Sequence, residues 1–409
     1  MENVVKFGIG FVTGRPNVCE VINNTYERLL KQIRAENQKV EITIFILFDL
    51  RYQDATREAF YKINPEVHKN IEIKYITPED IEKEKKELLE KKILKEDENE
   101  LFFGYGHARG RNTLMYFAKK ENIDYLLFWD DDEYPVACIK DEENNKIIWK
   151  EQNNITKHLD YIKNSDVTIG YHCGYISPIP YVEINKDVNE ELFKQYIEAI
   201  SNEVVSWECI KQKFEKDNGI TYANEDIANG NGAYVQKDEG KGNWVVGSTL
   251  CLNLRNIDKI PAFYNPEGAR GEDAFFSVNL KDSKITKVPV YHFHDGFLKY
   301  KEVMQQKYPK ELKEIKALDK NVEARFFNAS MGWIKYKPLF LYLTDKENYK
   351  EKIMRTYEGL KSSIPEINKL FNDNVFDTLI LSLKEYDDKV EIHYEEFIKV
   401  NKIWDKLKN

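Results

Sequence analysis

The sequence predicts an α/β protein with a mostly parallel central sheet and a helical C-terminal region. Short runs of β-branched and aromatic residues alternate with segments of helical periodicity as far as residue 293. Several of these runs are apolar throughout, which is typical of parallel strands that helices cover on both faces. Beyond residue 300 the pattern is helical and contains no further glycine-rich turns.

The chain opens with a β-α-β pattern. Strands predicted at Val4–Val12 and Glu41–Phe48 enclose a helix that Asn17 can cap. A third strand is predicted at Ile71–Ile76. The charge-dense segment 78–100 carries isoleucine and leucine at helical spacing, so we expect an exposed amphipathic helix there.

The next elements place acidic residues at the end of a strand. A helix predicted over 108–121 leads into the apolar strand Tyr125–Trp129, which runs directly into four acidic residues, 130–133. Ligands of such sheets bind beyond the carboxyl ends of the strands. The sequence therefore predicts a functional site at residues 130–133.

The remaining elements follow the same alternation. Strands are predicted at 166–171, 244–254 and 285–293, a helix at 272–280, and a polar, helical stretch at 187–218. The segment Asn229–Asn243 is rich in glycine, asparagine and lysine, so we expect a mobile loop that closes over a bound substrate.

The length of 409 residues allows two or three domains. We expect a catalytic domain over residues 1–298, with a donor-binding half at about 1–150 and an acceptor-binding half at about 151–298. Residues 299–409 form a helical C-terminal region in this prediction.

Composition excludes several classes of protein. The content of 42% hydrophobic and 13% aromatic residues is too high for a disordered chain. The formal net charge of -9 disfavours binding to nucleic acid or to an anionic membrane. Five scattered cysteines with no Cys-x-x-Cys pair imply neither a disulfide framework nor a zinc ribbon. The longest apolar run, Ile42–Phe48, is strand-sized, so we expect a cytoplasmic protein with no transmembrane segment.

Three consecutive aspartates, Asp130, Asp131 and Asp132, form the first candidate site. Strand alternation points Asp130 and Asp132 to the same side of the chain. Two convergent carboxylates suit a hard cation such as magnesium or manganese, which keeps coordination positions for water and substrate phosphate. A solvated acidic turn is the alternative reading.

Two histidines, His292 and His294, lie at the end of the last predicted strand. Alternation again places both on one side, so both imidazoles can face one point in space. They become metal ligands only if the fold brings them to the aspartates; otherwise they are structural histidines.

Acidic and basic helix starts supply further candidates. Glu272 and Asp273 begin a helix after a glycine-containing turn, where a carboxylate serves either as a helix cap or as a general base for a substrate hydroxyl. Arg109, Arg111 and Asn112 lie at another helix start, where guanidinium groups and free backbone N–H groups suit phosphate oxygens.

The order of these features resembles the GT-A type glycosyltransferases over about residues 4–296. Asp130-Asp131-Asp132 matches the Asp-x-Asp motif, which in that family holds a divalent cation on the diphosphate of a sugar nucleotide. Arg111-Asn112 is similar to an Arg-Asn pair of the family-two branch. His292-Phe293-His294 is similar to the histidine pair that completes the metal site of some beta-galactosyltransferases.

The resemblance implies a Rossmann-like GT-A sandwich and a reaction. Gly271-Glu272-Asp273 looks like the element whose Asp is the base in inverting members, which makes Asp273 the expected base. Thr13 and Asp49 lie at strand ends where the nucleoside of the donor is expected. Trp207, Trp244 and Tyr264 are candidates to stack on an acceptor sugar, with a core or surface role equally open.

The resemblance implies a Mn²⁺- or Mg²⁺-dependent enzyme that transfers a sugar from a nucleotide-sugar donor to a glycan, a lipid-linked or a protein acceptor. Asp132 and His294 are the expected cation ligands, and Arg111 stabilises the leaving diphosphate. Two alternatives remain open from the residues alone: a metal-dependent nucleotidyl- or phosphotransferase, and a non-catalytic carbohydrate-binding or scaffolding protein with a structural calcium ion.

Overall fold

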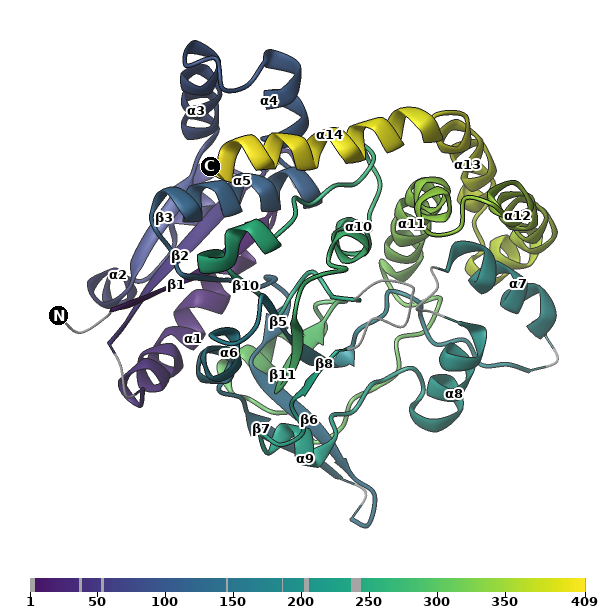
Figure 1. Ribbon diagram of the computed structural model, residues 1–409. Helices are drawn as coiled ribbons and strands as arrows, with labels where there is room; N and C mark the ends of the chain where they lie inside the picture. The colour runs from purple at the N-terminus through teal and green to yellow at the C-terminus, as the bar shows by residue number, and fades with distance from the viewer. Residues whose placement is uncertain are drawn as a thin grey trace.

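The computed structural model describes residues 4–36, 39–52, 55–144, 146–185, 187–201, 206–236 and 244–408. A large, mostly parallel sheet forms its centre, with helices packed on both faces (Figure 1). The strand order along the sheet is β3-β2-β1-β4-β10-β8-β11-β5, and β9 also pairs with β11. The predicted class, a mostly parallel α/β sheet followed by C-terminal helices, is confirmed.

The first half of the sheet is parallel throughout. It consists of β1 (Val5–Thr13), β2 (Val40–Phe48), β3 (Glu72–Ile76) and β4 (Tyr125–Phe128). β1 and β2 are almost completely buried because both faces of this half carry helices. All four strands agree with the sequence prediction to within a residue or two.

The second half mixes strand directions. β10 (Leu250–Asn253) runs antiparallel between β4 and β8 (Val167–Tyr175), and β11 (Ile285–Asp295) pairs with β8 in parallel. The two-residue strands β5 (Glu133–Tyr134) and β9 (Tyr234–Val235) are antiparallel to β11. A separate hairpin, which the sequence analysis did not predict, is formed by β6 (Val136–Asp141) and β7 (Lys146–Glu151).

Alternating residues of β4 pack into two hydrophobic cores, one on each face of the sheet. In β4, Tyr125 and Leu127 pack with α1 (Asn17–Arg34) and α6 (Asn154–Ile162) in one core. Leu126 and Phe128 face the opposite core. That second core also contains side chains of α3 (Pro78–Glu90), α4 (Glu96–Phe102), α5 (His107–Lys120), α10 (Glu272–Asn279) and α14 (Val390–Lys408).

The C-terminal helices pack against the sheet domain and also form a core of their own with two earlier helices. α14 returns across the sheet to lie against α4 and α5 (Figure 1). There the indole of Trp404 stacks on Phe102 and donates to the carbonyl of Ile260 over 2.8 Å. A third core contains side chains of three C-terminal helices, α11 (Val322–Thr344), α12 (Tyr349–Phe371) and α13 (Thr378–Asp388). Two earlier helices, α7 (Glu190–Ile200) and α8 (Trp207–Asp217), complete this core.

Short elements connect these helices and strands. They are the helices α2 (Pro65–Asn70) and α9 (Glu225–Ala228) and the 3₁₀ turns η1 (Arg57–Tyr61), η2 (Leu254–Lys259), η3 (Lys301–Gln305) and η4 (Val375–Asp377).

Three local predictions need correction. The amphipathic segment 78–100 forms two helices, α3 and α4, because residues 91–95 turn the chain. Asn17 is not the cap of α1; Pro16 occupies the cap position, and the Asn17 amide donates instead to the carbonyl of Asp131 over 2.6 Å. The strand predicted at 244–254 is short, since residues before Leu250 leave the sheet to pass the site described below.

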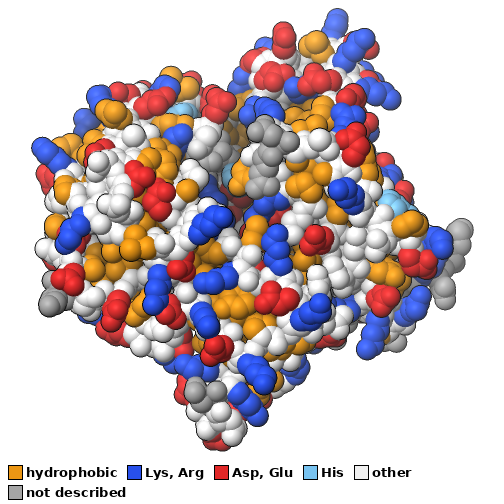
Figure 2. All heavy atoms as spheres, turned by 180° about the vertical axis from the view of Figure 1, so that it is seen from behind, with side chains coloured by type: hydrophobic (Ala, Val, Ile, Leu, Met, Phe, Trp, Pro, Cys, Tyr) orange, Lys and Arg blue, Asp and Glu red, His pale blue; other side chains and the backbone are white. Residues whose placement is uncertain are grey.

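Residues 237–243 of the predicted closing loop, Asn229–Asn243, lie outside the described residues. In the described ranges, no helix is both long and apolar enough to cross a lipid bilayer. On the face opposite to that of Figure 1, acidic and basic side chains are interspersed (Figure 2).

Candidate active site

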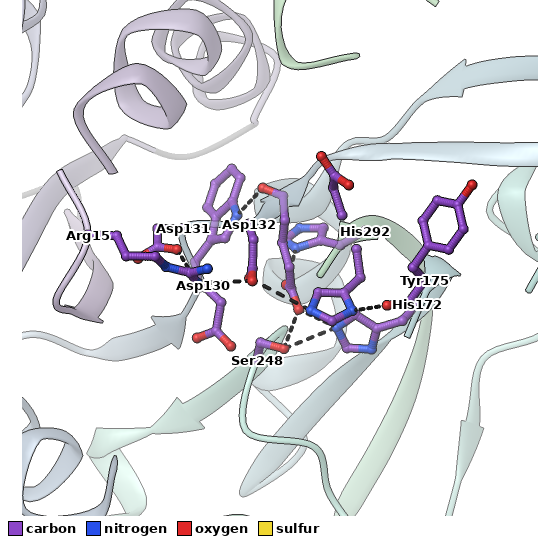
Figure 3. Close-up of polar contacts among 12 residues, drawn as sticks. Arg15, Asp130, Asp131, Asp132, His172, Tyr175, Ser248 and His292 are labelled. Carbon is purple, nitrogen blue, oxygen red and sulfur yellow. Dashed lines mark hydrogen bonds and ion pairs between the residues drawn. The ribbon is translucent and has the colours of Figure 1, made fainter. Parts of the chain in front are cut away.

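The acidic residues after β4 form a turn at the carboxyl edge of the sheet. Strand β4 ends at Phe128, so Asp130, Asp131 and Asp132 do not alternate as residues of a strand do. Asp131 and Asp132 are each 4% exposed, whereas the side chain of Asp130 is 39% exposed. Asp131 and Asp132 both pair with Arg15 (Figure 3), whereas Asp130 faces Arg111, which corrects the predicted grouping of Asp130 with Asp132 by strand alternation.

Asp131 is bound by residues at the end of β1. The hydroxyl of Thr13 donates to its carboxylate, and Arg15 forms an ion pair with it. Burial raises the pKa of Asp131 to about 6, although the charge of Arg15 opposes this shift. Asp131 thus fixes the β1 end and Arg15 next to the acidic turn.

Asp132 lies between Arg15 and His294. Arg15 Nη2 is 2.9 Å from Asp132 Oδ2, and His294 Nε2 is 3.7 Å from Asp132 Oδ1. The other ring nitrogen of His294, Nδ1, lies 2.7 Å from the carbonyl of Tyr175. Burial alone would raise the pKa of Asp132, but the charges of His294 and Arg15 outweigh it and keep the pKa below its ordinary value.

Glu133 is the centre of a buried network that the sequence analysis did not predict. Its carboxylate accepts from the hydroxyl of Ser248 over 2.5 Å and lies 2.9 Å from His172 Nε2 and 3.0 Å from His292 Nδ1 (Figure 3). His292 Nε2 is 3.4 Å from the amide of Asn154, so both ring nitrogens of His292 have partners. Glu133 was visible in sequence only as the fourth residue of an acidic run, and His172 only as the residue after the predicted strand 166–171.

Arg111 connects the acidic turn with the start of α10. Arg111 Nη2 is 3.6 Å from Asp130, and Arg111 Nε is 3.4 Å from Glu272 Oε1. The guanidinium is only 6–7% exposed and lies over the ring of Phe128. A Cβ on Gly247 would lie 2.8 Å from Arg111 Nη2, so a larger residue at this position would require the guanidinium to move. Two sites that the sequence analysis proposed separately therefore share one arginine.

Asp273 lies in the first turn of α10 without capping it. The cap is Gly271, whose φ of +87° favours glycine. Asp273 accepts from the backbone N–H groups of Ala274 over 2.8 Å and of Gly247 over 3.3 Å. Burial and the adjacent charge of Glu272 raise the pKa of Asp273 to about 6.

The side chains of other predicted residues make contacts elsewhere. Asp49 pairs with the guanidinium of Arg51, and Arg109 donates to the carbonyl of Glu100. Tyr264 is 3% exposed and donates to Glu396. Trp207 is buried on α8, and the half-buried ring of Trp244 packs on Phe340.

Asn112 is completely buried and exchanges two hydrogen bonds, each 2.8 Å, with the backbone of Phe263. Asn112→Ala leaves a buried N–H and a buried carbonyl without partners, so we expect the free energy of unfolding to fall by about 2 kcal/mol. Urea denaturation of this variant and of the exposed control Asn144→Ala measures the difference. A loss of donor binding with unchanged stability would instead support the predicted donor contact.

A cavity of about 330 Å³ opens beside Arg15. Its volume is at the lower end of the range for small-molecule sites, which is about 300–1,000 Å³. Three basic residues contribute to its wall, which consists of Arg15, Pro16, Asn17, Cys19, Glu20, Asn23, Ala59, Lys62, Leu298 and Lys301.

Asp132 and His294 suit a divalent cation. Their facing atoms are 3.7 Å apart, less than two coordination bonds of about 2.0–2.6 Å each, so one ion can contact both. Among the described residues, no three His, Cys, Asp or Glu side chains form a complete ligand set. Water and substrate oxygens would have to supply the other positions, as is usual for magnesium.

No protein-family model matches this chain, and no curated protein sequence matches it.

Proposed function

We propose that the protein is a metal-dependent glycosyltransferase that transfers a sugar from a nucleotide-sugar donor to an acceptor hydroxyl with inversion. The observation that carries this proposal is the 3.7 Å approach of Asp132 to His294, two candidate cation ligands that are far apart in sequence. Arg111 supports it further by connecting the acidic turn with the Glu272-Asp273 helix start. The proposal includes a GT-A type fold, to which the β-α-β opening and the Asp-Asp-Asp turn after β4 lend support.

In this proposal Arg15 and Arg111 bind the diphosphate of the donor. Both guanidinium groups already face carboxylates, and a phosphate oxygen is an equivalent partner for their planar donor groups. The cavity beside Arg15 provides room for part of the donor. Thr13 and Asp49, at adjacent strand ends, remain the candidates for contact with the nucleoside.

Asp273 accepts the proton of the acceptor hydroxyl in the proposed reaction. The acceptor oxygen forms a bond to the anomeric carbon while the bond from that carbon to the diphosphate oxygen breaks, and the electron pair leaves with the diphosphate. Arg15 and Arg111 stabilise the negative charge that develops there. Asp132 and His294 would hold a Mn²⁺ or Mg²⁺ ion, which when bound would supply Lewis-acid neutralisation of the same charge.

Asp273 is a better base than its neighbour Glu272. The carboxylate of Glu272 faces Arg111, and the charges of His107 and Arg111 outweigh burial and lower its pKa. The pKa of Asp273 is raised to about 6, which is closer to the neutral pH at which a base works best. The two carboxylates thus differ in proton affinity in the direction that the proposal needs.

A screen of donor hydrolysis tests this function. The purified protein with MnCl₂ is incubated with UDP-, GDP-, CDP- and dTDP-sugars, and the released nucleotide is identified by chromatography. We expect slow, manganese-dependent release of a nucleoside diphosphate from one donor class. Release of a sugar phosphate would instead indicate nucleotidyl or phosphoryl transfer, and no manganese-dependent cleavage or binding of any donor would contradict the proposal.

A further inference from the structure

Arg325, in the first turn of α11, brings the C-terminal helices to the candidate active site. A Cβ on Gly296 would lie 2.8 Å from Arg325 Nη2 and 2.9 Å from His294 Cε1, so the guanidinium and the imidazole approach the same glycine. The guanidinium also lies 5.1 Å from the ring centre of Phe297. Arg325 is therefore a neighbour of the Asp132–His294 pair, although it is far from both in sequence.

Arg325 is half-buried, and one nitrogen of its guanidinium group lacks a partner. Its Nε atom is buried and has no hydrogen-bond partner among the described residues, and none of them forms an ion pair with Arg325. A buried N–H of a charged group without an acceptor is costly, because the group has lost water and gained nothing in exchange. Arg325 is thus placed to bind an anion that enters the site.

Arg270, in the turn before α10, packs against the side of α11 that also carries Arg325. Its side chain packs over Gly332, where an added Cβ would lie 2.6 Å from Arg270 Cγ. Gly332 is seven residues after Arg325, so both positions are on one side of the helix. Arg270 also has no ion-pair partner within 4.0 Å in the part of the chain that the structure describes.

Both arginines interact electrostatically with carboxylates of the acidic site. Burial lowers the pKa of Arg325, the carboxylate of Asp132 opposes this, and the positive charges of Arg270 and Arg15 add to it. Arg270 in turn acts on Glu272, at the start of α10. The two arginines thus extend from the acidic turn toward the proposed base, and an anion between them would relieve their mutual repulsion.

We propose that Arg325 and Arg270 form a binding site for a phosphate group of a substrate. The planar fork of arginine suits phosphate oxygens, and the two arginines lie along one side of α11. The phosphate belongs either to the donor diphosphate or to a phosphorylated acceptor. This inference rests on the proposed function in one respect: it takes the molecule that carries the phosphate group to be a substrate of the proposed glycosyltransferase.

Calorimetric titration of the full chain with inorganic pyrophosphate, with and without MnCl₂, tests the site. We expect Arg325→Gln and Arg270→Gln each to weaken pyrophosphate binding about 10- to 100-fold, the effect of losing a charged hydrogen-bond partner. Arg355→Gln is the matched control, because Arg355 is 73% exposed on α12 and pairs only with Glu351 among the described residues. Arg325→Lys keeps the charge but not the fork, so it should bind with intermediate affinity.

Manganese dependence separates the two sources of the phosphate. If the arginine-dependent binding requires MnCl₂ and is also lost in Asp132→Asn, the site holds the donor diphosphate. If it persists without MnCl₂, the site holds an acceptor phosphate. The inference is overturned if wild-type protein binds no pyrophosphate, or if both glutamine variants and Arg325→Lys bind it as the control does. No donor is turned over in this experiment, so its outcome is independent of the hydrolysis screen.

Discussion

Asp132→Asn is expected to reduce manganese-dependent activity about 10³-fold or more. Asparagine keeps the shape of Asp132 but loses the negative charge that would bind the cation. Lewis-acid stabilisation by a bound metal contributes several kcal/mol to the transition state, and each 1.36 kcal/mol corresponds to a factor of ten in rate. Steady-state rates with the donor found in the hydrolysis screen, and Mn²⁺ affinity from electron paramagnetic resonance, measure the two effects.

Two control variants separate this effect from a loss of folding or of general charge. Asp388→Asn removes a carboxylate that is 61% exposed and pairs with Lys384, so it should change neither Mn²⁺ affinity nor rate. Asp131→Asn alters the adjacent carboxylate, which Thr13 and Arg15 already bind, and should retain most of the Mn²⁺ binding. Undiminished Mn²⁺ affinity in Asp132→Asn would remove Asp132 from the ligand set.

The strands and helices were predictable from the sequence wherever the pattern of hydrophobic residues is regular. The strands of the parallel half are buried on both faces, so their apolar runs mark them clearly in sequence. The hairpin β6–β7 was missed because its second strand, Lys146–Glu151, is partly exposed and charged at both ends. The antiparallel direction of β10 could not be read at all, since strand direction depends on how the chain returns to the sheet and not on residue type.

The site was predictable only as separate groups of residues. The aspartates, His294 and the Glu272-Asp273 pair each stand out at the end or start of an element, and the general rule for parallel sheets brings such positions together. The strand alternation assumed for Asp130 and Asp132 was wrong because the chain turns directly after Phe128. Glu133 stands out only as a member of the acidic run, and His172, Ser248 and Arg325 carry no local pattern. The contacts of all four depend on elements that lie far apart in sequence.

Asp273→Asn is expected to lower kcat by about 10² to 10⁴, the range for loss of a general base, with little change in donor affinity. The amide keeps the size of Asp273 and an oxygen for the N–H of Gly247, so the start of α10 is preserved. Because burial and Glu272 disfavour the charged form of Asp273, its neutral replacement should not lower the melting temperature. A residue needed only for the helix would show the opposite pattern, with reduced stability of about 1 kcal/mol and nearly unchanged kcat.

The pH dependence of the activity proposed for the wild-type protein gives an independent test of Asp273. A base must be deprotonated to accept the acceptor proton, and the folded-state pKa of about 6 means that this form is lost as pH falls through 6. We therefore expect kcat/KM to decrease below pH 6, and this acidic limb to be absent from the residual activity of Asp273→Asn. Glu272→Gln, the matched neighbour, should keep an acidic limb because the charges around Glu272 lower its own pKa, but the limb should move to lower pH because the negative charge of Glu272 helps to raise the pKa of Asp273. A product with the anomeric configuration of the donor would exclude this role, since retention does not proceed by a single displacement that one base assists.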